Sequence, residues 1–183
     1  MAIILVDMDC VLADFEEGHR RMCAEHGLPP EVEARDRVCW DILEAVPAVW
    51  RDAVKELWHE PGFFAGLDPI IGAVETLHTW LRQGHKVFIC TAPLMNSETC
   101  AQEKLAWVRR HVGIEFVRRT IITADKTLIH GDFLLDDRPD ITGAATPTWK
   151  HLLFATDANR VYGQPAERHT WTTARSLISQ SSS

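Results

Sequence analysis

The sequence predicts an α/β protein: a three-layer sandwich with a central parallel sheet and a small helical cap. Short apolar runs rich in β-branched residues alternate with longer segments of helical periodicity along the 183-residue chain. The run Ile3–Val6 has no polar position, which is typical of a strand buried on both faces of a parallel sheet. This strand leads into Asp7 and Asp9. Because ligands of open α/β sheets bind at the carboxyl ends of the strands, we expect a site there.

The amino-terminal part of the chain divides into a strand, a helix and an insert. After the first strand, a helix is expected over residues 11–26. The insert is rich in acidic and aromatic residues, and several of its apolar positions have helical spacing. We interpret residues 29–64 as a helical cap inserted between two core segments, 1–28 and 65–180, with a disordered tail over 181–183. A plain pair of core-packing helices is the alternative interpretation of the aromatic residues in the insert.

The rest of the core is expected to alternate helices with strands. Helices are predicted over 71–82, 97–112 and 173–179, and strands over 86–90, 120–123, 133–135 and 151–154. In the second of these helices, Ala101, Leu105, Val108 and Val112 form one apolar series and predict its buried face. Strands that alternate with helices indicate a parallel sheet with crossover connections.

Composition and charge exclude several classes of protein. The net charge of −7 offers no electrostatic footprint for long nucleic acid or an anionic membrane, so neither is expected as a partner. No apolar run approaches membrane-spanning length. The amino terminus has no basic region before its apolar run, so a signal peptide is not expected. The five cysteines are scattered and lack a C-x-x-C pair, which indicates reduced thiols rather than disulfides or a zinc site. We therefore expect a cytoplasmic protein.

Four features of the sequence fall at or just beyond the carboxyl ends of predicted strands. They are the pair Asp7 and Asp9, then Thr91, then Lys126, then the pair Asp136 and Asp137. Each is weak alone, since a lone Thr is usually a turn or cap residue and a lone Lys is usually solvated. Together their chemistry is complete: carboxylates bind a divalent cation such as Mg²⁺, a hydroxyl and an ammonium group bind phosphate, and one carboxylate can attack phosphorus.

In this order the four features resemble the motifs of the haloacid dehalogenase (HAD) phosphatase superfamily. Several stretches look more specifically like the 5′(3′)-deoxyribonucleotidases, among them Asp7–Phe15, Val87–Leu94, Asp125–Thr127 and Thr146–Trp149. The resemblance runs from about Ile3 to Arg160 and implies a HAD-like, Rossmann-type core. It also implies a Mg²⁺-dependent phosphatase that acts on a small-molecule nucleoside monophosphate of the deoxyribose series.

The resemblance also implies a role for each site residue. Asp7 would attack phosphorus and form an aspartyl-phosphate, while Asp9 would protonate the leaving oxygen and then activate water. Metal ligands would be Asp7, Asp9 through its carbonyl, and Asp137, with Asp136 adjacent. Substrate-binding positions would be Phe15, Cys39, Trp40, Thr91, Ala92 and Lys126. The chain departs from the family at Cys10, where Gly is usual, at Ala92, where a small polar residue is common, and at Ala124, where relatives carry Arg.

Two alternatives remain open at this point. The first is a HAD phosphatase for another small phosphomonoester, and the second is a catalytically silent module that binds a nucleotide or Mg²⁺. The sequence decides neither the base, nor the position of the phosphate, nor selection between deoxyribose and ribose. The aromatic residues of the cap are compatible with a homodimer.

Overall fold

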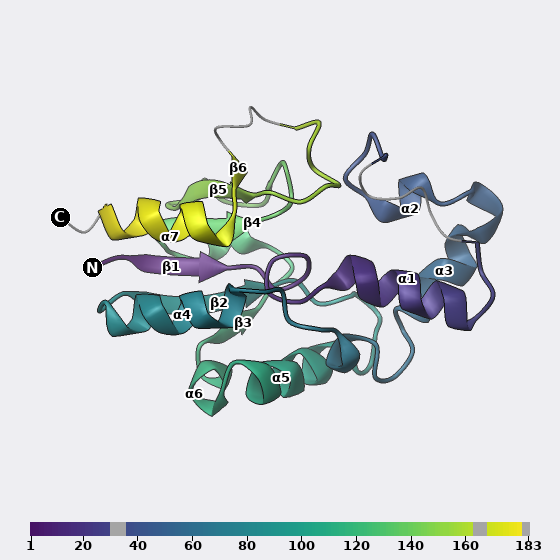
Figure 1. Ribbon diagram of the computed structural model, residues 1–183, viewed down its shortest axis with the longest axis horizontal. Helices are drawn as coiled ribbons and strands as arrows, with labels where there is room; N and C mark the ends of the chain where they lie inside the picture. Colours follow the sequence, from purple (N-terminus) through teal and green to yellow (C-terminus); the bar gives the residue numbers. More distant parts are fainter. Residues whose placement is uncertain (30–35, 163–167, 181–183) are drawn as a thin grey trace.

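The centre of the molecule is a parallel sheet, which confirms the predicted α/β fold (Figure 1). The computed structural model describes residues 1–29, 36–162 and 168–180. Within these ranges the sheet has six strands in the order β3-β2-β1-β4-β5-β6. The strands are β1 (Ile3–Val6), β2 (Lys86–Thr91), β3 (Thr120–Ile122), β4 (Phe133–Asp136), β5 (Lys150–Phe154) and β6 (Arg168–His169).

Strand β1 lies in the middle of the sheet and pairs in parallel with β2 and β4. Its residues Ile4, Leu5 and Val6 are fully buried, as an unbroken apolar run predicts for a central parallel strand. Val6 lies opposite Ile89 of β2 and Leu135 of β4. Since all three strands run in the same direction, the polar residues that follow them meet at one edge of the sheet.

The two faces of the sheet are covered differently. The described helices are α1 (Phe15–Glu25), α2 (Ile42–Ala45), α3 (Arg51–Leu57), α4 (Ala73–Arg82), α5 (Cys100–His111), α6 (Ile114–Val117) and α7 (Trp171–Gln180), with short 3₁₀ turns η1 (Ala48–Trp50), η2 (Phe64–Gly66) and η3 (Lys126–Leu128). Helices α4 and α7 lie side by side on one face, where the rings of Trp80 and Trp171 are 5.9 Å apart (Figure 1). On the other face, Leu5 and Leu134 pack with Trp149 from a connecting segment. The third layer is therefore built from connections and η3.

The cap end of the molecule lies beyond the carboxyl ends of the strands. Figure 1 shows α1 grouped there with α2 and α3. Helix α1 packs on this group through Phe15, whose ring lies 5.2 Å from that of Trp58. The domain boundary at residue 28 remains a prediction.

The helix predicted over residues 11–26 begins later than expected, and its predicted start was wrong. Helix α1 starts at Phe15, with the Asp14 side chain accepting a hydrogen bond from the Glu17 N–H as N-cap. Cys10 has φ 58°, a left-handed conformation that prevents a regular helix from starting directly after β1. The Met8 carbonyl accepts hydrogen bonds from Leu12 and Ala13, so the intervening residues form a compact turn.

Other boundaries also differ from expectation. Helix α5 begins at Cys100 rather than at Ser97, and the short elements α6 and β6 were not predicted. The buried residues of α5 are Cys100, Lys104, Trp107 and Val108. Of the predicted series, Val108 and Val112 are buried, whereas Ala101 and Leu105 are only half-buried. The predicted tail over 181–183 lies outside the described residues. In the described part of the chain, every helix is too short or too polar to cross a bilayer.

Candidate active site

The first acidic residue of the site is positioned by the central strand. Asp7 directly follows β1, and its backbone N–H donates to the Leu135 carbonyl at 2.9 Å, which extends the pairing with β4. Its side chain is buried. The compact turn after Met8 then brings Asp9 to the same edge of the sheet, where both carboxylates line a cavity of about 420 Å³.

Lys126 joins the amino-terminal acid to the late acidic pair. Its Nζ lies 2.6 Å from Asp7 Oδ1 and 2.6 Å from Asp136 Oδ2. Burial raises the pKa of Asp7 to about 6, against the opposing charge of Lys126 and with further contributions from Asp136 and Asp9. Burial also opposes the charge on Lys126, but Asp7 and Asp136 outweigh it and raise the pKa of that lysine.

Three carboxylates converge at this edge. Oxygens of Asp7, Asp136 and Asp137 all lie within 4.8 Å of one another, and all three residues are buried. Burial raises the pKa of Asp137, and the neighbouring Asp136 and Asp7 raise it further. One lysine offsets only part of the charge of three carboxylates, and hard divalent cations prefer oxygen ligands. The donor set therefore fits a hard divalent cation.

A second lysine contacts Asp9 from the other side of the segment Asp7–Asp9, which we call the acidic turn. Lys104 of α5 is fully buried, and its Nζ donates to Asp9 Oδ2 at 2.6 Å and to Thr91 Oγ1 at 2.9 Å. Two buried lysines thus hold the acidic residues of the site: Lys126 pairs with both Asp7 and Asp136, and Lys104 pairs with Asp9. The predicted set of site residues did not include Lys104.

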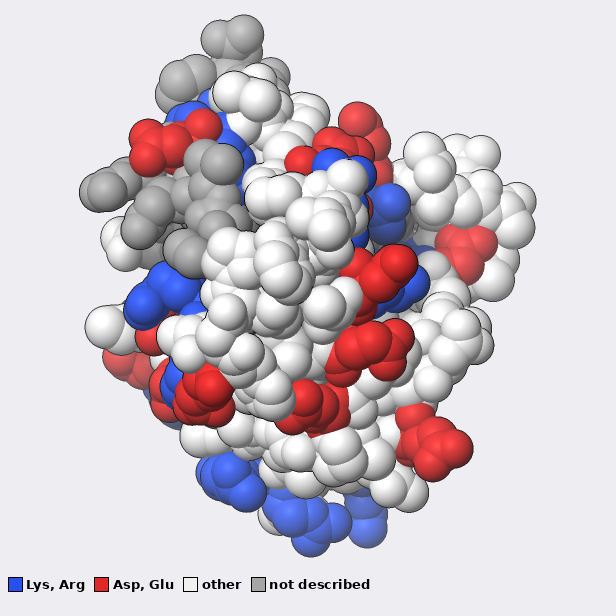
Figure 2. All heavy atoms as spheres, turned by 90° about the vertical axis from the view of Figure 1, so that its right-hand side faces the viewer, with Lys and Arg blue, Asp and Glu red and all other residues white. Residues whose placement is uncertain are grey.

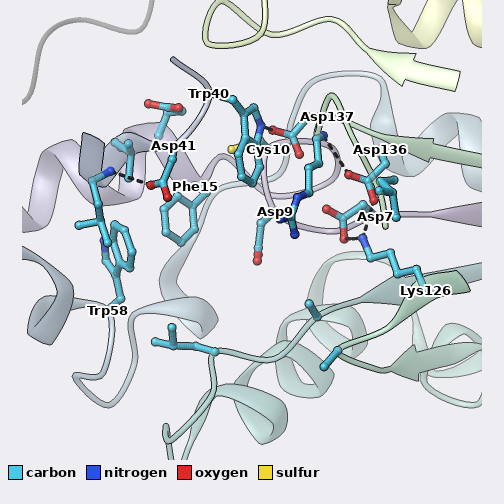
Figure 3. Close-up of a pocket in the computed structure, with 18 of the residues that line it drawn as sticks. Asp7, Asp9, Cys10, Phe15, Trp40, Asp41, Trp58, Lys126, Asp136 and Asp137 are labelled. Atoms are coloured by element: carbon cyan, nitrogen blue, oxygen red, sulfur yellow. Dashed lines mark hydrogen bonds and ion pairs between the residues drawn. The ribbon is translucent and has the colours of Figure 1, made fainter. Parts of the chain in front are cut away.

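The cavity has an acidic end and an aromatic end (Figure 3). Phe15 and Trp58 lie toward one end, and Asp7 and Lys126 lie at the other. Trp40 stands between them, and its indole N–H donates to Asp137 Oδ2 at 2.7 Å. An elongated ligand with one anionic group and one flat apolar group matches this arrangement.

The surface around the cap end is not strongly basic. In Figure 2, acidic side chains are spread over the middle of this face, and a group of Lys and Arg side chains lies at its lower edge. Lys126, the cation beside Asp7, is only 8% exposed. Lys126 therefore supplies positive charge inside the cavity, and the exposed residues Lys55 and Arg138 also line it.

The chain matches one protein-family model along almost its whole length. Residues 1–182 match the family described as 5′ nucleotidase, deoxy (pyrimidine), cytosolic type C protein. The chain belongs to this family. A Bordetella bronchiseptica relative, provisionally named 5′(3′)-deoxyribonucleotidase, is 43% identical over 161 residues, covering 86% of each chain. The human 5′(3′)-deoxyribonucleotidase, cytosolic type, is 39% identical over 171 residues, covering 90% of this chain and 85% of the relative.

Solved structures agree with the family assignment at the level of the fold. A HAD family hydrolase from Deinococcus radiodurans superposes with a TM-score of 0.57 at 17% identity, covering 98% of this chain and 96% of the other. A haloacid dehalogenase-like protein from Streptococcus pneumoniae gives a TM-score of 0.55 at 9% identity, covering 97% of this chain and 98% of the other. The family match and the named relatives confirm the resemblance to the 5′(3′)-deoxyribonucleotidases, and the solved structures confirm the HAD-like fold.

Most of the predicted site residues of this deoxyribonucleotidase-family chain meet at the cavity, but two stand back from it. The cavity is lined by Asp7, Asp9, Phe15, Trp40, Ala92, Lys126, Asp136 and Asp137. Thr91 is fully buried behind this wall, where its hydroxyl accepts from Lys104. Cys39 also lies outside the lining, and its thiol is 3.6 Å from the Asp41 carbonyl. The ligand contacts proposed for Thr91 and Cys39 remain predictions.

Proposed function

We propose that this chain is a Mg²⁺-dependent phosphatase that hydrolyses deoxyribonucleoside monophosphates to deoxynucleoside and phosphate. The observation that supports it most strongly is the position of Asp7, whose carboxylate lies in the cavity beside Lys126, with Asp9 lining the same wall. Family membership and the names of the relatives agree with this reaction.

The proposed reaction has two steps, both carried by side chains of the acidic turn. Asp7 attacks phosphorus to form an aspartyl-phosphate, and the bond from phosphorus to the sugar oxygen breaks. Asp9 gives a proton to that departing oxygen, then takes a proton from the water that attacks the phosphorus and releases Asp7. Lys126 holds the phosphate oxygens, because phosphoryl transfer depends chiefly on positioning and charge stabilisation.

Asp7 and Asp137 would hold the metal, with the Asp9 carbonyl as a further ligand and Asp136 adjacent. When bound, Mg²⁺ would supply positive charge that favours ionised Asp7 and offsets the charge of the phosphate group. Asp136 itself is held by Lys126 and by the Arg138 backbone N–H, which donates to its Oδ1 at 2.9 Å. This arrangement favours a supporting role for Asp136.

The aromatic end of the cavity would receive the nucleoside. Phe15, Trp40 and Trp58 offer ring faces and edges against which a base could pack. A cytoplasmic location belongs to the proposal, supported by the human relative named as the cytosolic type and by free cysteines in the described residues. The predicted homodimer remains open.

The test is phosphate release from a panel of deoxyribonucleoside and ribonucleoside monophosphates and sugar phosphates, with Mg²⁺ and with excess chelator. The proposal predicts Mg²⁺-dependent release, fastest with deoxyribonucleotides. Preference for a sugar phosphate would favour the alternative of another phosphomonoesterase. Binding of nucleotide without release would favour a silent binding module.

A further inference from the structure

Lys104 has no role in the reaction as proposed above, yet it is among the most completely buried charged side chains of the described chain. Its Nζ makes three contacts, to Asp9 Oδ2 at 2.6 Å, to Thr91 Oγ1 at 2.9 Å and to the Ala92 carbonyl oxygen at 2.7 Å. It also lies 5.0 Å from the centre of the Phe64 ring. Burying an ammonium group is costly, so an arrangement this complete suggests a function.

The three contacts use the whole hydrogen-bonding capacity of the ammonium group. A lysine has three N–H donors and no acceptor, and Lys104 meets three oxygens. No donor is left for a substrate, and Lys104 does not line the cavity. Lys126 differs, since it does line the cavity. Lys104 can therefore act on a bound substrate only through the groups that it holds.

The carboxylate of Asp9 is held from one side only. Oδ2 accepts from Lys104, while Oδ1 is buried and has no hydrogen-bond partner among the described residues. The side chain of Asp9 is 28% exposed, so without Lys104 it could turn toward solvent. The bond from Lys104 therefore fixes the direction of the Asp9 carboxyl group.

Helix α5 is itself fixed to the surrounding structure. The neighbouring Glu103 accepts hydrogen bonds from the backbone N–H groups of Gly62 at 2.7 Å and Phe64 at 3.0 Å. One turn further on, the Trp107 indole N–H donates to the Leu67 carbonyl at 2.8 Å. Lys104 therefore projects from a helix that is held on both sides of its position, as a precise positioning role requires.

We infer that Lys104 is a positioning residue that holds the carboxyl group of Asp9 in the orientation needed to protonate the leaving oxygen. This inference rests on the proposed phosphatase reaction. As the bond from Asp7 to phosphorus forms and the bond from phosphorus to the leaving oxygen breaks, the proton of Asp9 passes to that oxygen. A misdirected Asp9 leaves an alkoxide to depart unprotonated, which is slow for a sugar oxygen.

The test compares two leaving groups in the variant Lys104→Met. The sugar oxygen of dUMP needs a proton to depart, whereas the nitrophenolate of p-nitrophenyl phosphate departs without one. General acid catalysis contributes about 10²- to 10⁴-fold, so kcat/KM for dUMP should fall at least about 10²-fold. For p-nitrophenyl phosphate the fall should be less than about tenfold. The constant kcat/KM is used because it covers only the steps through departure of the leaving group.

Glu103→Gln is the matched control, because it weakens contacts of the adjacent residue outside the cavity. It should lower thermal stability and leave the ratio of the two kcat/KM values unchanged. That ratio also cancels any loss of folded protein in Lys104→Met. Equal losses on both substrates, including complete loss on both, would overturn the inference. Absence of phosphate release from dUMP by the wild type would instead refute the proposed function.

Discussion

The indole N–H of Trp40 donates a hydrogen bond to Asp137 Oδ2 at 2.7 Å. This bond connects the predicted cap to the three converging carboxylates of Asp7, Asp136 and Asp137. The same indole ring lies under the guanidinium group of Arg138, 5.4 Å from the ring centre. Trp40→Phe keeps a ring in this place and removes the N–H. Because hydrogen bonds to charged groups contribute about 1.5–3 kcal/mol, we expect the free energy of unfolding in urea to fall by about 1–2 kcal/mol.

Trp50→Phe is the control for this variant. Trp50 also lies in the cap, but it is 41% exposed. Its replacement should change the free energy of unfolding by less than about 0.5 kcal/mol. Equal effects of the two substitutions would show that the bond between Trp40 and Asp137 contributes nothing specific.

Cys10 occupies a backbone conformation that favours glycine. Its φ is 58°, and the left-handed region costs a non-glycine residue roughly 1–2 kcal/mol. A glycine at this position avoids that cost, but its greater conformational freedom in the unfolded chain offsets about 0.5–1 kcal/mol of the gain. Cys10→Gly should therefore raise the free energy of unfolding by up to about 1 kcal/mol, measured in urea, and retain phosphate release. A clear loss of stability would mean that the thiol packs more favourably than the backbone argument allows.

His85 makes stability depend on pH. It is buried, and its Nδ1 accepts from the Ala2 N–H at 3.3 Å. Burial, and then the charge of the amino terminus, lowers the pKa of His85 from its ordinary value of 6.5. The unfolded chain therefore binds a proton at this residue more readily than the folded chain does. The resulting contribution to stability is present above pH 6.5 and is lost as the pH falls below that value.

The measurement is the free energy of unfolding at several pH values for the wild type and for His85→Gln. The variant should lose less stability than the wild type between pH 7 and pH 5, because its amide does not titrate in this range. His130→Gln, at an exposed position, provides the control. Parallel curves for wild type and His85→Gln would contradict the prediction.

The convergence of the acidic residues with Lys126 could be predicted because parallel strands end at one edge. Asp7 follows β1 and Asp136 ends β4, its neighbour in the sheet, so strand order alone brings their side chains together. The apolar runs that form β1, β2, β4 and β5 were equally clear. The short elements were not, since α6 has four residues and β6 only two.

Lys104 could not be found by the same reasoning. Its helix shows an apolar series at 101, 105, 108 and 112, and a lysine beside such a series is normally solvated. In the fold the buried face includes Val108 of that series but also Cys100, Lys104 and Trp107, and Asp9 provides a partner for the buried Lys104. The late start of α1 could not be predicted for a related reason. The left-handed backbone conformation of Cys10 leaves no sign in the spacing of apolar residues.

The most direct test of the proposed reaction is phosphate release from dUMP by Asp7→Asn, compared with the wild type at saturating Mg²⁺. The amide keeps the shape of the side chain but is a poor nucleophile, so release should fall by more than about 10³-fold. Circular dichroism and thermal unfolding would establish that the variant is folded. Release by the folded variant at a rate near that of the wild type would contradict the assignment of Asp7 as the attacking group.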